Sequence, residues 1–187
     1  MEIENILDKI YKLPEVSKNN LIETISEVEY PKGYRLLNAD KVERNIYFIK
    51  KGIVRAYVSS SDNDITFWFG KEGDTVVSMK SYVNNQKGYE NIELLENGTL
   101  YKLNVDALNQ LFEKDIHIAN WGRKFAEQEL LKTEERLIAR QFRTASERYS
   151  ELMKQTPELL QRIQLSHIAS YLGITQVSLS RIRAKLK

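Results

Sequence analysis

The residues best suited to bind another molecule lie near the end of the chain, between positions 176 and 185. Arg181, Arg183 and Lys185 stand there, and no Asp or Glu occurs from Gln161 onward. Arginine can donate two parallel hydrogen bonds to guanine, and both Arg and Lys pair with phosphate groups. The segment therefore favours nucleic-acid binding, although a solvated basic tail would have the same composition.

Other kinds of functional site have little support in the sequence. The chain has no Cys, which excludes disulfides, thiolate catalysis and cysteine-held zinc or iron–sulfur centres. Its two histidines, His117 and His167, are far apart, so we expect no metal site and no cofactor. His167 is expected at the surface or facing a phosphate. Carboxylate pairs such as Glu134-Glu135 belong to solvated helix faces, and we expect a protein that is not an enzyme.

The basic segment coincides with the spacing of a helix-turn-helix. If Leu165 is its first position, small Ala169 falls where two helices cross and Gly173 falls at the turn between them. Thr175 can then cap the second helix. Apolar residues at the required spacing would form the inner face, namely Ile168, Leu172, Ile174, Leu179 and Ile182. The pattern predicts helices at about residues 166–172 and 176–186, and an ordinary helical hairpin is the alternative.

Helical phase defines the face of the second helix that would meet DNA. With Leu179 inward, Val177, Arg181 and Ala184 point outward. Arg181 could then pair with guanine O6 and N7, and Val177 could contact a thymine methyl group. Gln176 would reach a phosphate or an adenine, and Arg183 a phosphate. The expected DNA-binding residues are Gln176, Val177, Ser178, Ser180, Arg181, Arg183, Ala184 and Lys185.

The elements that position this motif include a predicted strand-rich region as well as helices. Residues 1–27 predict one or two short helices, with Ile25 on an apolar face. From residue 28 to 104, short runs rich in Tyr, Phe, Val, Ile and Thr alternate with Gly and Asn turns. Seven or eight antiparallel strands are expected there, in a barrel, roll or sandwich. With a short helix at residues 106–112 and the helices that follow, the fold class is α+β.

A segment without Pro, from about 115 to 141, predicts one long helix. Its apolar positions fit neither a 3.5- nor a 3.6-residue repeat, so its two halves should face different partners. Trp121 and Phe125 would cover the core of the β-module, and the rest could join two copies as a homodimer. Three further helices should follow, the first over residues 145–154. We expect units at 1–114, 115–142 and 143–187.

Charge divides the chain in the same way. Residues 1–121 carry a net charge of −4 and residues 122–187 a net charge of +6, which together give the +2 of the whole chain. A basic module that follows an acidic one is typical of nucleic-acid binding. No apolar run is long enough for a membrane span or a signal peptide. A cytoplasmic location without a membrane partner is expected.

With these features, the chain resembles the Crp/Fnr superfamily of bacterial transcription regulators over essentially its whole length. The resemblance rests on a strand–Gly–strand element at 45–55 and on residues 145–149, 168–175 and 179–183. It implies an N-terminal antiparallel β-roll of the cyclic-nucleotide-binding, jelly-roll type, a long dimer helix and a small all-α helix-turn-helix domain. It also implies base reading by Arg181, a near-palindromic double-stranded DNA site with half-site centres about 10–10.5 bp apart, and RNA polymerase as a further partner.

Three departures from the family pattern affect the expected function. Members that bind cyclic AMP carry Gly-Glu-Leu and then an Arg that pairs with the phosphate. Here Val77-Ser78-Met79 replaces the first, and Gly88 falls near the Arg position. Val177 stands where the family commonly has Glu, which predicts a different base there, and no β-hairpin wing is expected after the recognition helix. The candidate pocket residues are Val77, Ser78, Met79, Lys80, Lys87, Tyr89 and Phe69.

The β-roll is therefore expected to bind an unidentified small-molecule effector or to serve as a scaffold, and not to bind cyclic AMP. The absence of Cys also excludes an iron–sulfur sensor of the Fnr kind. The alternative function is a ligand-binding or protein-interaction module whose wingless helix-turn-helix does not bind DNA. Retention on specific DNA at physiological salt separates the two hypotheses.

Overall fold

The structure, a computed structural model, describes residues 1–61 and 63–185. Two helices precede the strands, and these are α1 (Ile3–Ile10) and α2 (Glu15–Ile22). The β-region holds a single short helix and eight strands within the described residues: β1 (Ile25–Tyr30), β2 (Arg35–Leu37), β3 (Asn45–Lys51), β4 (Val54–Val58), β5 (Ile65–Gly70), β6 (Thr75–Val76), α3 (Met79–Asn84), β7 (Asn91–Leu94) and β8 (Gly98–Asn104). Helices follow to the end of the described chain: α4 (Val105–Lys114), α5 (Ile116–Phe142), α6 (Ala145–Gln155), α7 (Pro157–Arg162), α8 (Leu165–Leu172) and α9 (Gln176–Lys185).

The strands form two four-stranded antiparallel sheets that pack face to face as a roll. Their orders are β1-β8-β3-β6 and β2-β7-β4-β5. Alternating side chains of both sheets fill the space between them, as expected for strands with one buried face. The buried members include Leu37, Ile49, Val54, Leu94 and Leu100. The predicted α+β fold with an antiparallel β-roll is confirmed.

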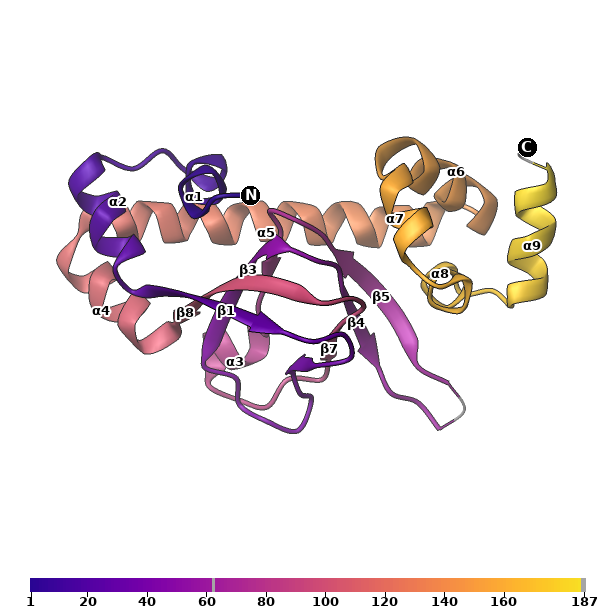
Figure 1. The fold of residues 1–187 in the computed structure, drawn as a ribbon, viewed down its shortest axis with the longest axis horizontal. Helices are drawn as coiled ribbons and strands as arrows, with labels where there is room; N and C mark the ends of the chain where they lie inside the picture. The colour runs from indigo at the N-terminus through magenta and orange to yellow at the C-terminus, as the bar shows by residue number, and fades with distance from the viewer. Residues whose placement is uncertain (62, 186–187) are drawn as a thin grey trace.

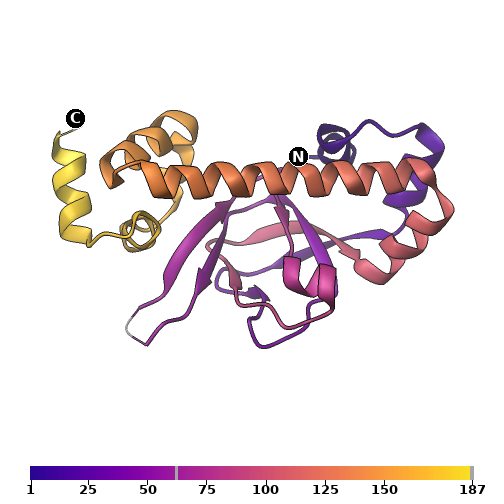
Figure 2. The ribbon, with the colours of Figure 1, turned by 180° about the vertical axis from the view of Figure 1, so that it is seen from behind.

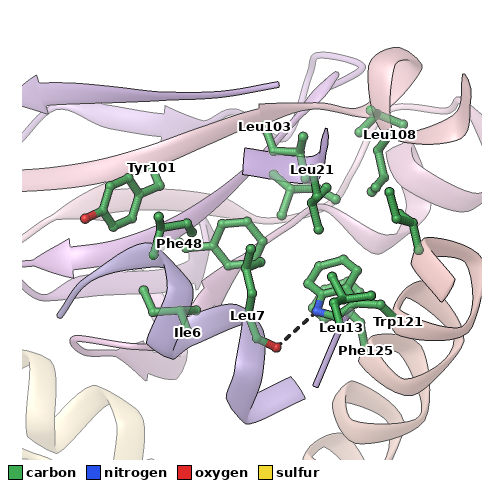
Figure 3. Packing of buried hydrophobic residues seen from close by; sticks show 14 residues of the cluster. Ile6, Leu7, Leu13, Leu21, Phe48, Tyr101, Leu103, Leu108, Trp121 and Phe125 are labelled. Carbon is green, nitrogen blue, oxygen red and sulfur yellow. Dashed lines mark hydrogen bonds between the residues drawn. The ribbon is translucent and has the colours of Figure 1, made fainter. Parts of the chain in front are cut away.

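Helix α5 runs along the molecule and joins its two ends (Figures 1 and 2). Its first half covers the roll, where Trp121 and Phe125 stack with ring centroids 5.8 Å apart. The Trp121 Nε1–H donates to the Leu7 carbonyl oxygen at 3.1 Å, which ties α1 to α5 inside the core (Figure 3). The prediction that Trp121 and Phe125 cover the core is confirmed.

The C-terminal helices share a third apolar cluster with the roll. Ile53 and Phe69 of the roll are buried against Tyr149, Ile163 and other residues of α6–α9. Phe69 and Tyr171 lie with their ring centroids 5.4 Å apart. The helices at the end of the chain therefore dock on the roll, and the long helix is not their only connection to it.

The structure differs from the expected elements at three places, and each difference has a local cause. Ile25 begins strand β1, where it pairs with Leu103, instead of lying on the apolar face of a helix. The short helix α3 was not predicted, because its six residues are too few to show a period. Four helices, not three, lie between residue 144 and the end of the described chain, since Pro157 takes the first position of α7, where its missing N–H costs nothing. The expected helix residue Leu186 lies outside the described residues.

Candidate nucleic-acid interface and ligand pocket

Helices α8 and α9 meet at a tight turn whose geometry depends on Gly173. This residue ends α8 with φ +67°, in the left-handed region that favours glycine. The Ile174 N–H donates to the Ala169 carbonyl oxygen at 3.0 Å and closes the turn. Apart from Gly173, its chain neighbours and the adjoining helix backbone, no heavy atom of the described residues lies within 4 Å of the position that a Cβ on Gly173 would occupy, so the backbone angle, not space, calls for glycine. The predicted turn is confirmed.

Polar contacts hold both ends of the turn. The Thr175 Oγ1 accepts the Ser178 N–H at 3.2 Å and caps α9, as the sequence predicts. The Ser178 hydroxyl lies 3.1 Å from the same oxygen, so it faces this cap. Arg148 of α6 donates to the Leu172 carbonyl oxygen at 2.7 Å, which places a positive charge at the C-terminal end of α8.

One face of α9 points to solvent. Its inner face is buried through Leu179, and Ile182 packs against the same cluster. Val177 is 62% exposed. The exposed predicted residues are Gln176, Val177, Ser180, Arg181, Ala184 and Lys185, whereas Ser178 and Arg183 are half-buried.

The basic side chains of this face are available for contacts outside the chain. Within residues 1–61 and 63–185, no salt bridge or side-chain hydrogen bond involves Arg181, Arg183 or Lys185. Exposed cations beside an apolar side chain can meet phosphates and base edges at once. We refer below to the exposed residues 176, 177, 180, 181, 184 and 185 as the α9 face.

His167 lies elsewhere than predicted. It is half-buried between α8 and the roll, with its Nδ1 atom 2.6 Å from Nη1 of Arg55 on β4. Burial lowers the pKa of His167, and the Arg55 charge lowers it further. The prediction of a surface or phosphate-facing position is therefore wrong, because the roll and α8 meet across a distance that local sequence patterns do not encode.

In the segment where a cyclic nucleotide would bind, residues from its two ends pack closely against each other. This segment runs from Val77 through α3 to Glu90, which is 6% exposed. The Glu90 carboxylate accepts the Tyr89 N–H at 3.0 Å. A Cβ on Gly88 would lie 2.6 Å from the Ser78 Oγ and 3.1 Å from either Glu90 oxygen. Backbone and side chains thus fill the space between residues 78, 88 and 90.

The other predicted pocket residues do not line a common cavity. Four of them are exposed, namely Met79, Lys80, Lys87 and Tyr89. Val77 packs against the apolar cluster that contains Trp121 and Phe125 of α5. Phe69 is buried instead in the third apolar cluster, against the C-terminal helices. Two hollows among the described residues lie away from these positions. The first, of about 300 Å³, lies among Lys9, Gly73, Gln128 and Lys132, and the second lies beside Tyr30 and Asn97.

The described residues of this segment offer no cationic partner for a cyclic phosphate. Such a phosphate would carry a negative charge to a place where Glu90 is already buried, and both nearby lysines point to solvent. Burying a phosphate without a cationic partner, beside a carboxylate, is strongly unfavourable. The Ser78 hydroxyl, itself buried without a hydrogen-bond partner among the described residues, offers no charge.

Comparisons with known proteins agree with this architecture. Residues 27–115 match the family model of the cyclic nucleotide-binding domain. No curated protein matches the chain. A structure of FixK2 from Bradyrhizobium japonicum is similar, with a TM-score of 0.73 and 21% identity over 87% of this chain and 84% of that chain.

Two further solved structures share the fold from end to end. A putative transcriptional regulator of the Crp/Fnr family from Eubacterium rectale has a TM-score of 0.75 and 14% identity, over 97% of this chain and 87% of that chain. The catabolite activator protein of Thermus thermophilus has a TM-score of 0.59 and 16% identity, over 97% and 86%. The chain therefore has a cyclic-nucleotide-binding-type β-roll, a long helix and C-terminal helices arranged as in Crp/Fnr regulators. No helix among the described residues is long and apolar enough to cross a membrane.

Proposed function

We propose that the protein is a sequence-specific, DNA-binding transcription regulator of the Crp/Fnr type, and that α8 and α9 form its helix-turn-helix. The observation that carries the proposal is the α9 face, where Arg181 lies exposed at the centre between Val177 and Ala184. A helix with this face can enter the major groove, with Arg181 donating to guanine and Val177 against a thymine methyl group. Arg183 and Lys185 would pair with phosphates.

Regulators that read palindromic sites act as dimers, and α5 offers a surface for a second copy. Leu130, Leu131, Leu137, Ile138 and Phe142 form an exposed apolar stripe on its second half, here named the α5 seam. Leu137 is 63% exposed and Phe142 75% exposed. The pairs 130/137 and 131/138 repeat every seven residues, as in helices that pack against an identical partner. A dimer through this seam buries the stripe and presents two α9 faces.

The roll then acts without a cyclic nucleotide. Glu90 occupies the place where a phosphate would need a cation, and Gly88 closes the space beside it. This supports a regulator in which the roll is a scaffold, or responds to another small effector, within units at 1–114, 115–142 and 143–187. RNA polymerase would be the partner of the DNA-bound dimer.

Selection of bound duplexes from a random-sequence library tests the proposal. The purified chain is used at about 0.15 M salt, with and without cyclic AMP. We expect enrichment of a near-palindrome with half-site centres about 10–10.5 bp apart, and the same result in both arms. Enrichment only with cyclic AMP would contradict the closed pocket.

Matched variants identify the residues that read the site. Arg181→Ala should lower affinity for the selected duplex by about 1–3 kcal/mol, or roughly 5–150-fold, and relax one base position. Arg183→Ala should weaken all sequences alike and reduce the salt dependence by about one phosphate contact. Lys114→Ala, which removes an exposed charge from α4, serves as the control. No selected sequence at all would favour the module that does not bind DNA.

A further inference from the structure

The contact between α8 and the roll is built around one buried arginine. The Arg55 side chain, 6% exposed, rises from β4 and meets charged or polar groups of three other segments. Its Nη2 donates to the Asp64 carboxylate at 2.9 Å, and its Nε lies 2.9 Å from the Glu93 carboxylate. The Nε–H is not aligned as a hydrogen bond, so this second contact is an ion pair. The third contact, from Nη1 to Nδ1 of His167 at 2.6 Å, crosses to α8.

This third contact requires a neutral histidine. A guanidinium can only donate hydrogen bonds, so Nδ1 of His167 must accept and carry no proton. A proton on Nδ1 would remove the acceptor and place two cations 2.6 Å apart. The contact therefore exists in one protonation state of His167 and not in the other.

Charged groups on several segments act on His167 in opposite directions. Burial lowers its pKa most, and Arg55 on β4 and Lys32 after β1 lower it too, whereas Glu93 on β7 and Asp64 before β5 raise it. The net direction is downward, so the neutral form is favoured in the docked state. The contribution of the Arg55–His167 contact to the docking of α8 is therefore complete above the ordinary histidine pKa of about 6.5. It is lost as the pH falls through the lowered pKa of His167.

A neighbouring hydrogen-bond pair couples α8 to β5 at the same place. The Ser170 hydroxyl of α8 donates to the Asp64 carbonyl oxygen at 2.8 Å and accepts the Thr66 N–H at 2.9 Å. Because Thr66 uses its N–H for this contact, movement of α8 away from the roll leaves that amide open to water. Hydrogen exchange of the Thr66 amide therefore reports whether α8 is docked on the roll.

The contacts of α7 do not share this sensitivity to mild acid. Arg162 of α7 pairs with Glu72 and Glu96 of the roll. Burial raises the pKa of Glu72, but hydrogen bonds from Arg162 and Gly52 outweigh that effect and bring it to about 2. This carboxylate stays charged at every pH at which histidine titrates, so α7 remains attached.

We propose that Arg55 and His167 form a proton-sensitive latch, which holds α8 against the β-roll at neutral pH and releases it in mild acid while Arg162 keeps α7 attached. At about pH 5, an imidazole with the ordinary pKa, as in the undocked state, is about 97% protonated. Because the docked state needs the neutral form, the equilibrium constant for docking of α8 against the roll falls by up to about 30-fold. The latch does not rest on DNA binding, because both of its sides belong to the chain itself.

Distance measurements in the full-length protein test the latch without DNA. Because the chain has no Cys, Val83→Cys and Val177→Cys introduce two exposed labelling sites, one on α3 and one on α9. Spin-labelled chain, diluted in unlabelled chain, is compared at about pH 7.5 and about pH 5, which bracket the histidine pKa. We expect a second, broader distance population in acid and a matching loss of Thr66 amide protection, corrected for intrinsic exchange.

Two variants separate the latch from a general effect of acid. In His167→Asn, the side-chain oxygen takes the place of Nδ1 as acceptor and takes up no proton, so the distances should be the same at both pH values. His117→Gln removes the other, exposed histidine and should behave like the parent protein. The latch is refuted if the parent distances do not change, if His167→Asn changes as the parent does, or if NMR shows that His167 titrates above about 6.5.

Discussion

Replacing Glu72 by Gln measures how strongly the C-terminal helices are tied to the roll. Arg162 donates from Nη2 and Nη1 to the two Glu72 oxygens, at 2.7 and 3.2 Å, and the Gly52 N–H donates to the first at 3.0 Å. Burial acts to raise the pKa of Glu72, but these hydrogen bonds outweigh it and lower the pKa from 4.5 to about 2. The glutamine keeps the shape of the side chain and removes its charge.

The size of the effect follows from that pKa. A lowering of the pKa from 4.5 to about 2 corresponds to roughly 3 kcal/mol. The Glu72 side chain is 30% exposed, so solvent screening reduces this to about 1–2 kcal/mol. For a chain of this length, the melting temperature should fall by roughly 2–8 °C. Because the folded-state pKa is lowered, the stabilisation is complete above the unfolded value and is lost as the pH falls toward the folded value.

Thermal unfolding followed by circular dichroism measures this loss. At neutral pH, Glu72→Gln should melt below the parent protein by the amount given above, and the difference should shrink toward about pH 2. Glu113→Gln, at an exposed site on α4, is the matched control. If Glu72→Gln costs no more than Glu113→Gln at neutral pH, or if the difference does not depend on pH, the ion pair does not join the two parts as argued.

Two further predictions concern the dimer and the pocket. Leu137→Glu should leave the fold of the monomer intact, since its side chain is already exposed, but should convert the proposed dimer to monomers in sedimentation experiments. Arg140→Glu, on the other side of α5, should not. Cyclic AMP at 1 mM should not raise the melting temperature, whereas a site with a Kd of about 10 μM would add about 2.7 kcal/mol of stability. A clear rise would mean that the segment from Ser78 to Glu90 opens to accept a phosphate.

The sequence predicts the elements whose patterns are local. The turn at Gly173 needs a residue that tolerates positive φ, and the Thr175 cap lies three positions from its partner, so both can be found by spacing alone. The antiparallel strands expected between residues 28 and 104 and the long helix α5 are confirmed for the same reason. The phase of α9, with Leu179 inward and Val177 outward, is also set by helix geometry.

What the sequence does not predict depends on contacts between distant segments. Arg55 and His167 are 112 positions apart, and nothing near either residue indicates that they meet. Nothing in the sequence around Glu90 indicates that its carboxylate is buried, because its position beside Ser78 depends on the turn at Gly88. By pattern Phe69 could line a pocket, although an aromatic run in a strand is more often part of a core, and the docking of the C-terminal helices shows that it is buried in the core.

The docking contacts, and not the covalent connection, determine where α9 lies relative to α5. Only Arg143 and Thr144, both with extended backbone, separate α5 from α6, and two such residues can adopt many relative orientations. In a dimer joined by the α5 seam, the distance between two α9 faces therefore depends on contacts such as Arg162–Glu72. Glu72→Gln should broaden the half-site spacing among selected duplexes while leaving the preferred bases unchanged, whereas Arg181→Ala should change one base and leave the spacing unchanged. If Glu72→Gln altered the bases, or left the spacing as narrow as in the parent protein, the orientation of α9 would be determined within α5–α6 instead.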